Sequence, residues 1–284
     1  MRLRLPTLLL LLSAIAHPGH SSDLLITMCN FKYFPGAVSL LESARTHGAW
    51  HQELAVLVTD DVPSCARHVF EGMNVHVINI SDQWVGKRYP THAGPADWIT
   101  TVHFGKLDIL TQPYFRRFAR IVYADSDMKV RQPLLQLLEA VDNAPAAYVR
   151  VGNAEATLYR EAHTPVAKDI QTRFPDRQKV HSTRLMVFNT RLLSSPAEMA
   201  VTLTKLLTTV GSTFNKMYEQ GVLQLLFYTS LADLPAADVA LLLEHYYSSA
   251  LPWDPKHRSF GKFALWFEAQ THASTCFRQA VFQR

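Results

Sequence analysis

Two aspartates, Asp125 and Asp127, flank one small residue directly after an apolar run, Ile121–Ala124. Such a run is typical of a buried strand, and side chains two apart on a strand point the same way. Carboxylates at a strand end are costly to bury unless a cation pairs with them, and their oxygens suit Mg²⁺ or Mn²⁺. Ser126 is small enough to let a ligand approach. The pattern therefore predicts a divalent metal site, with a solvated, capped turn as the alternative.

Two distant residues could complete such a site. Lys106 lies in an apolar helical segment before the strand, and its ammonium group could meet an anionic ligand. His245 ends a later apolar run, and imidazole is an acceptable Mn²⁺ ligand. Taken alone, Lys106 also fits a solvated helix face, and His245 also fits a hydrogen-bonded histidine at the rim of a core.

The elements that must position these residues alternate between strand and helix. This alternation predicts an α/β fold with a single Rossmann-like sheet flanked by helices, in which residues 153–180 form an excursion. Ligands of such sheets bind beyond the carboxyl ends of the strands, where Asn30, the aspartates and His245 are expected to meet. The expected strands are Leu24–Met28, Leu54–Val58, Val75–Ile80, Arg120–Ala124, Ala146–Val151 and Leu185–Asn189. The expected helices are Pro35–Arg45, Pro63–Phe70, Thr100–Leu110, Pro133–Ala140, Pro196–Thr209 and Tyr218–Tyr228.

The composition of the 284 residues is globular, with a formal net charge of +4. The basic residues are scattered, so no nucleic-acid partner is expected. Residues 1–16, possibly up to 22, read as a signal peptide, with an uncleaved membrane anchor as the alternative, and residues 23–284 as the folded domain. We expect the secretory pathway: the endoplasmic reticulum or Golgi lumen, or secretion. The sequon at Asn79 is consistent with a glycoprotein.

The chain has three cysteines without the CxxC spacing of a zinc site. Cys29 falls in an expected strand and is interpreted as a small core residue. Cys65 and Cys276 form the only disulfide that we consider, and an odd count leaves at least one thiol without a partner in the chain.

Several blocks together make the chain resemble glycosyltransferase family 8, the glycogenin-like enzymes of the GT-A fold. The resemblance covers about Leu24 to Pro255, and the blocks follow the family's order. They are Ile26–Asn30 with Tyr33 and Gly36–Ala37, Lys106–Leu107, Val122–Asp127, Leu185–Asn189, Glu219–Gln224, and His245–Tyr247 with Pro252–Trp253.

The resemblance implies a mixed sheet and a retaining hexosyltransferase that uses a UDP-sugar donor and a glycan or protein acceptor. It implies that Asn30 and Tyr33 contact the uridine and that Ser126 lies at the nucleotide-sugar. It implies that Lys106 faces the diphosphate or donor sugar and that Glu219 and Gln220 lie on the catalytic helix. Asp125, Asp127 and His245 would bind Mn²⁺. Related enzymes are often dimers, so a homodimer is possible.

Some positions depart from the family pattern. Arg184 and Leu251 stand where the family has a glycine and a phosphate-binding lysine, Glu219 replaces an aspartate, and Gln224 replaces an asparagine. These departures leave open a degenerate domain that binds a nucleotide or glycan without turnover. A haloacid-dehalogenase-like phosphatase is a further alternative, because a strand ending in Asp-x-Asp also opens that fold, with the first aspartate as nucleophile.

Overall fold

The computed structural model describes residues 22–81, 104–143, 146–151, 154–157, 172, 179–181, 183–210, 218–227, 230–234 and 243–245. Within them a mixed seven-stranded sheet has the order β10-β6-β9-β4-β1-β2-β3. Only β9 runs antiparallel to its described neighbours, β4 and β6. The strands are β1 (Leu24–Cys29), β2 (Glu53–Val58), β3 (His76–Asn79), β4 (Arg120–Ala124), β6 (Tyr148–Val151), β9 (Leu185–Asn189) and β10 (Leu231–Leu234).

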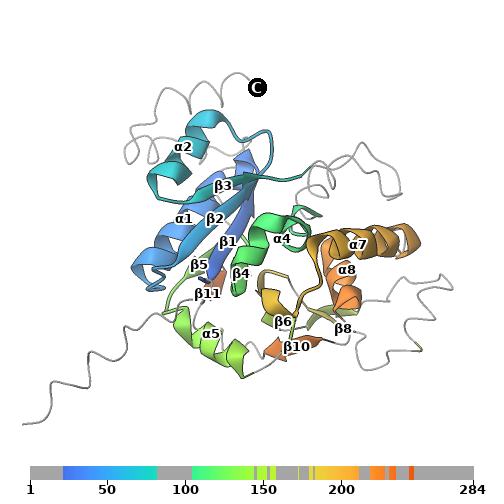
Figure 1. Cartoon of the computed structure of the whole chain (residues 1–284). Helices are drawn as coiled ribbons and strands as arrows, with labels where there is room; N and C mark the ends of the chain where they lie inside the picture. Colours follow the sequence, from blue (N-terminus) through green and yellow to red (C-terminus); the bar gives the residue numbers. More distant parts are fainter. Residues whose placement is uncertain are drawn as a thin grey trace, which may run out of the picture.

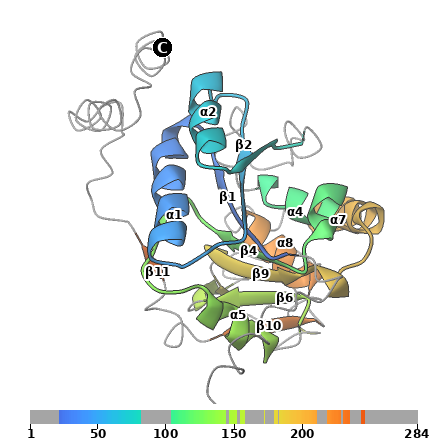
Figure 2. The same cartoon turned by 60° about the vertical axis from the view of Figure 1, so that its left-hand side comes forward.

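Helices cover both faces of this sheet (Figures 1 and 2). One core packs beneath α1 (Phe34–Thr46), α2 (Ser64–Gly72) and α5 (Leu135–Asp142). The other packs beneath α4 (Asp108–Thr111), α7 (Pro196–Val210) and α8 (Tyr218–Leu226). Because strand side chains alternate, β1 sends Leu25 and Cys29 to the first core, and Leu24, Ile26 and Met28 to the second. Short 3-10 turns complete the layers: η1 (Phe31–Tyr33), η2 (Pro113–Arg117) and η4 (Thr190–Leu192).

The predicted α/β fold with one mixed, helix-flanked sheet is confirmed. Two small ribbons lie outside the main sheet: β5 (Met128–Val130) pairs with β11 (Leu243–His245), and β7 (Ala154–Thr157) pairs with β8 (Lys179–His181). The second ribbon belongs to the predicted excursion. The sequence did not predict β5 or β10 as strands. The helix expected over Thr100–Leu110 is described only from residue 104, and it turns at residues 106–107 before α4 begins.

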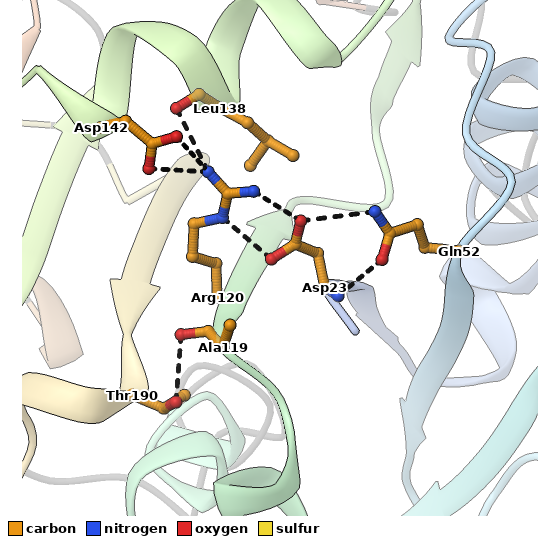
Figure 3. A network of polar contacts seen from close by, with 7 residues as sticks. All are labelled: Asp23, Gln52, Ala119, Arg120, Leu138, Asp142 and Thr190. Carbon is orange, nitrogen blue, oxygen red and sulfur yellow. Dashed lines mark hydrogen bonds and ion pairs between the residues drawn. The ribbon is translucent and has the colours of Figure 1, made fainter. Parts of the chain in front are cut away.

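A partly buried ion pair holds the amino ends of β1 and β4 together (Figure 3). Arg120 donates two hydrogen bonds to Asp23, at 2.9 and 2.7 Å, and reaches Asp142 at the end of α5 at 2.7 Å. Gln52 accepts a hydrogen bond of 2.7 Å from the backbone N–H of Asp23. This network lies at the opposite end of the strands from the predicted metal site, so it stabilises the frame without touching the site.

The cysteines differ in state. Cys65 is disulfide-bonded, and Cys29 carries a free, buried thiol as predicted. Cys276, Leu251 and the predicted leader lie outside the described residues. No helix within the described ranges is both long and apolar enough to span a membrane.

Candidate active site

A tight turn carries the two aspartates at the carboxyl end of β4. The Met128 N–H donates to the Asp125 carbonyl at 3.0 Å, which closes the turn and leads the chain into β5. The Asp125 N–H donates to the Arg184 carbonyl at 2.8 Å, at the start of β9. Asp125 and Asp127 are half-buried, and Ser126 between them is buried. The backbone of this turn is therefore fixed by one hydrogen bond within it and by one to the residue before β9.

Helix α1 packs directly against the same turn. A Cβ atom added to Gly36 would lie 2.3 Å from the Ser126 carbonyl oxygen, so only glycine allows this approach. About two helical turns later, the Ser43 hydroxyl accepts a hydrogen bond of 2.9 Å from the Val130 N–H. Helix α1 thus supports both the aspartate turn and the strand that follows it.

One oxygen of Asp125 is the meeting point of a buried polar cluster. Its Oδ1 accepts hydrogen bonds from the Tyr123 hydroxyl at 2.7 Å and from the Lys106 ammonium at 3.0 Å. Lys106 also lies 2.9 Å from Glu219 Oε1 and 3.2 Å from the Thr183 hydroxyl. Thr183 in turn donates to Glu219 Oε1 at 2.6 Å. The cluster joins β4, β9, α8 and the segment before α4.

Burial and charge act in opposite directions on Lys106. Its side chain is 2% exposed, and burial alone lowers the pKa of an ammonium group. The carboxylates of Asp125 and Glu219 outweigh burial, so the Lys106 pKa lies above its ordinary value. Burial, followed by the charge of Asp125, raises the pKa of Tyr123 well above its ordinary value. Lys106 is therefore a permanent cation and Tyr123 a permanent hydrogen-bond donor at neutral pH.

The proposed uridine residues lie beside this turn. Because β1 pairs with β4 in parallel, with Ile26 opposite Tyr123, both strands end at the same edge of the sheet. Asn30 follows β1, and its side chain caps η1 by accepting from the Tyr33 N–H at 3.1 Å. Asp61, after β2, accepts from the Phe31 N–H at 3.4 Å and steadies the same loop. The edge therefore combines an amide, an aromatic ring and the aspartate turn.

His245 reaches the site through the small β5–β11 ribbon. The register places His245 opposite Met128, the residue after Asp127, although the two segments are far apart in sequence. Only the backbone of His245 is described. Among the side chains that are described, no three His, Cys, Asp or Glu residues group as a metal site. The structure therefore brings the predicted third ligand to the turn at the level of the backbone.

Helix α8 places its two predicted catalytic residues differently. Glu219 is fully buried and contacts Lys106 and Thr183, whereas Gln220 is half-buried. Further along α8, Gln224 accepts a hydrogen bond of 2.8 Å from the buried Arg150 of β6. Glu219 thus lies beneath the site, where it holds Lys106.

Sequence reasoning missed three residues of this site. Tyr123 entered only as part of an expected strand and of the Val122–Asp127 block, and neither Thr183 nor Asp61 was given a role in the site. For Tyr123 a signal existed, because residues two apart on a strand share a face and the Tyr123 hydroxyl can reach Asp125. No comparable local signal pairs Thr183 with Lys106 and Glu219.

Solved glycosyltransferases have a similar structure. LgtC, a galactosyltransferase solved with donor and acceptor sugar analogs, superposes with a TM-score of 0.58 at 13% identity, covering 92% of this chain and 95% of LgtC. The chain has the GT-A glycosyltransferase fold. The bifunctional glycosyltransferase WbbM gives a TM-score of 0.55 at 14% identity, over 93% of this chain. Core-mannan synthase A (CmsA/Ktr4) from Aspergillus fumigatus, solved in an Mn/GDP form, gives a TM-score of 0.53 at 8% identity. The match covers 81% of this chain and 76% of that one.

Sequence comparison adds no closer relative. No protein-family model and no curated protein matches the chain. The chain spans 52% of the length of WbbM but 95% of that of LgtC. At these low identities the likeness shows the fold, and the activity has to be argued from the site.

Proposed function

We propose that this protein is a metal-dependent, retaining glycosyltransferase that moves a hexose from a UDP-sugar to a hydroxyl group of a glycan or protein. The observation that carries the proposal is the aspartate turn at the carboxyl end of β4, beside Asn30 and Tyr33 at the end of β1. In open α/β sheets this edge is where ligands bind. A phosphatase of the haloacid-dehalogenase type is less well supported, because β4 follows three earlier strands and does not open the domain.

The donor set fits Mn²⁺. Asp125 and Asp127 offer carboxylate oxygens, and the backbone of His245 lies beside the turn, so that an imidazole could join them. When bound, the metal would act as a Lewis acid that stabilises the charge of the departing diphosphate. A glycosyltransferase of the same fold, CmsA/Ktr4, was solved in an Mn/GDP form, which is consistent with this assignment.

The other residues of the site would position the donor and the acceptor. Asn30 and Tyr33 would hold the uracil base, and the small Ser126 would let the donor approach the turn. The Lys106 ammonium keeps a permanent positive charge close to Asp125, which favours binding of an anionic diphosphate nearby. Retention of configuration and transfer to the acceptor then depend on holding the acceptor hydroxyl at the anomeric carbon, and the half-buried Gln220 of α8 would help to hold it.

The deciding experiment is a UDP-release screen of the purified chain across UDP-sugars with Mn²⁺. GDP-sugars form a parallel arm, since CmsA/Ktr4 binds GDP. We expect slow donor hydrolysis that Asp127→Ala abolishes. Asp142→Asn, at the opposite end of the sheet, is the matched control and should retain hydrolysis. If Asp127→Ala kept both hydrolysis and Mn²⁺-dependent UDP binding, the proposal would be wrong.

A second candidate is a domain that binds UDP or a glycan without turnover. The observation that favours it is the burial of Glu219, which is 0% exposed and bound to Lys106 and Thr183. A side chain held in this way cannot contact a donor sugar without rearrangement. This candidate predicts Mn²⁺-dependent UDP binding, but no UDP release from any donor even when an acceptor is present.

A further inference from the structure

The two carboxylate oxygens of Asp125 have different surroundings. Oδ1 accepts hydrogen bonds from Tyr123 at 2.7 Å and from Lys106 at 3.0 Å. Within the described part of the chain, Oδ2 accepts no hydrogen bond from a side chain. The Asp125 side chain is 24% exposed, whereas Lys106 is 2% and Tyr123 1% exposed. Both donors therefore approach the carboxylate from its buried side, and its exposed part remains available to a ligand.

Neither donor can move easily. Tyr123 belongs to the core between β4 and the α4–α7–α8 layer, and its neighbours on the adjacent strands are Ile26 of β1 and Met186 of β9. Lys106 is held from the other side by Glu219 at 2.9 Å and Thr183 at 3.2 Å. Two fixed donors on one oxygen restrict both side-chain torsions of Asp125. The carboxylate is thereby oriented before any ligand arrives.

The Tyr123 hydroxyl has no packing role that a phenylalanine ring would lack. A buried hydroxyl needs a partner, and Asp125 is the partner that this structure provides. Hydrogen bonds that orient a metal ligand typically change metal affinity by about 10- to 100-fold when they are removed. The expected consequence is therefore measurable on metal binding itself, independently of sugar transfer.

We propose that Tyr123 is a positioning residue which, together with Lys106, engages Oδ1 of Asp125 and reserves Oδ2 for the divalent cation. This inference rests on the proposed function, because it assumes that Asp125 binds a metal. It assigns to this chain a residue that acts on the metal through Asp125 and touches neither the metal nor the donor.

The test compares Tyr123→Phe with Tyr148→Phe. Tyr148, on β6, is equally buried in the same core, and its hydroxyl donates to Met186 Sδ at 3.1 Å, away from Asp125. Mn²⁺ binding is titrated by electron paramagnetic resonance without nucleotide, and urea unfolding is measured in EDTA. We expect Mn²⁺ affinity to fall about 10- to 100-fold in Tyr123→Phe and to remain within about twofold of wild type in Tyr148→Phe. Both variants should unfold at similar urea concentrations.

Each outcome separates this inference from the proposed function. If the wild-type protein binds no Mn²⁺, the proposed function fails and the inference fails with it. If the wild type binds Mn²⁺ and Tyr123→Phe binds it equally well, only the inference is overturned. A Tyr123→Phe protein that unfolds at much lower urea than Tyr148→Phe also contradicts it, because the hydroxyl would then serve the fold.

Discussion

Replacing Gly36 by alanine tests whether helix α1 sets the position of the aspartate turn. The added Cβ would lie 2.3 Å from the Ser126 carbonyl oxygen and 3.2 Å from its carbonyl carbon. Real Cβ contacts are essentially never shorter than 3.0 Å, so the helix or the turn must move by at least about 0.7 Å. The neighbour is backbone, which cannot rotate away as a flexible side chain could. Overpacking of this kind costs about 1–3 kcal/mol.

The displacement falls on the residues that the proposed function needs most. A misplacement of about 1 Å at a catalytic site can cost about 100-fold in rate. We therefore expect Gly36→Ala to lower Mn²⁺ affinity and UDP release by about 10- to 100-fold. Urea unfolding should show a loss of about 1–2 kcal/mol, after the better helix propensity of alanine offsets part of the strain.

Gly72 is the matched control, because it also lies in a helix but has open space around it. A Cβ added there meets nothing within 4 Å. Gly72→Ala should stabilise the protein by about 0.5–1 kcal/mol and leave Mn²⁺ binding unchanged. Helix propensity alone predicts that both variants unfold with a higher free energy than the wild-type protein. If Gly36→Ala were as stable as Gly72→Ala and bound Mn²⁺ normally, the close packing of α1 on the turn would be refuted.

Three other predictions concern residues outside the aspartate turn. Arg120→Met leaves the buried carboxylate of Asp23 without its guanidinium partner and should lower the free energy of urea unfolding by about 2–3 kcal/mol. Arg117→Met removes a more exposed ion pair and should lower it by only about 0–1 kcal/mol. Equal losses in the two variants would contradict this prediction. Burial raises the pKa of the Cys29 thiol, so above about pH 9 the unfolded chain releases a proton that the folded chain keeps, and the free energy of unfolding should fall with rising pH. Cys29→Ala should flatten that slope between pH 8 and 10. Asn79 is exposed at the end of the edge strand β3, so secretion from eukaryotic cells should give an endoglycosidase-sensitive mass shift that Asn79→Gln removes.

The sheet and most helices were predictable because their signals are local. The strand Arg120–Ala124 and the helix α1 follow from an apolar run and from a proline in a first helical turn. The strands β5 and β10 were not predicted, since they are only three and four residues long, too short for an apolar pattern to be decisive. Their pairing is set by partners far away in the chain, and local propensity does not record such partners.

In the candidate site, too, local sequence features were predictable and contacts between distant segments were not. The aspartate pair was visible in the sequence, and its meeting with the end of β1 was expected because ligands bind beyond the carboxyl ends of such strands. The contacts of Lys106 did not, because its 3.2 Å contact with Thr183 and its 2.9 Å contact with Glu219 join segments separated by 77 and 113 residues. A lysine in an apolar helical segment gives no sign of which carboxylates it will meet. Only the packing of α8 into the core that it shares with β4 and β9 decides that.

The charges of the cluster explain why such an arrangement suits a cation site. Lys106 supplies one buried ammonium group to two carboxylates, those of Asp125 and Glu219, and Asp127 adds a third carboxylate on the same turn. Carboxylates grouped this closely repel one another, and a divalent cation lowers the cost of bringing them together. Lys106 does not replace the metal, because Glu219 and Thr183 hold it beneath Asp125 on the side of Oδ1. On the proposed function, the fixed lysine orients one aspartate, and the carboxylates of the turn would attract the divalent cation with which the diphosphate would bind.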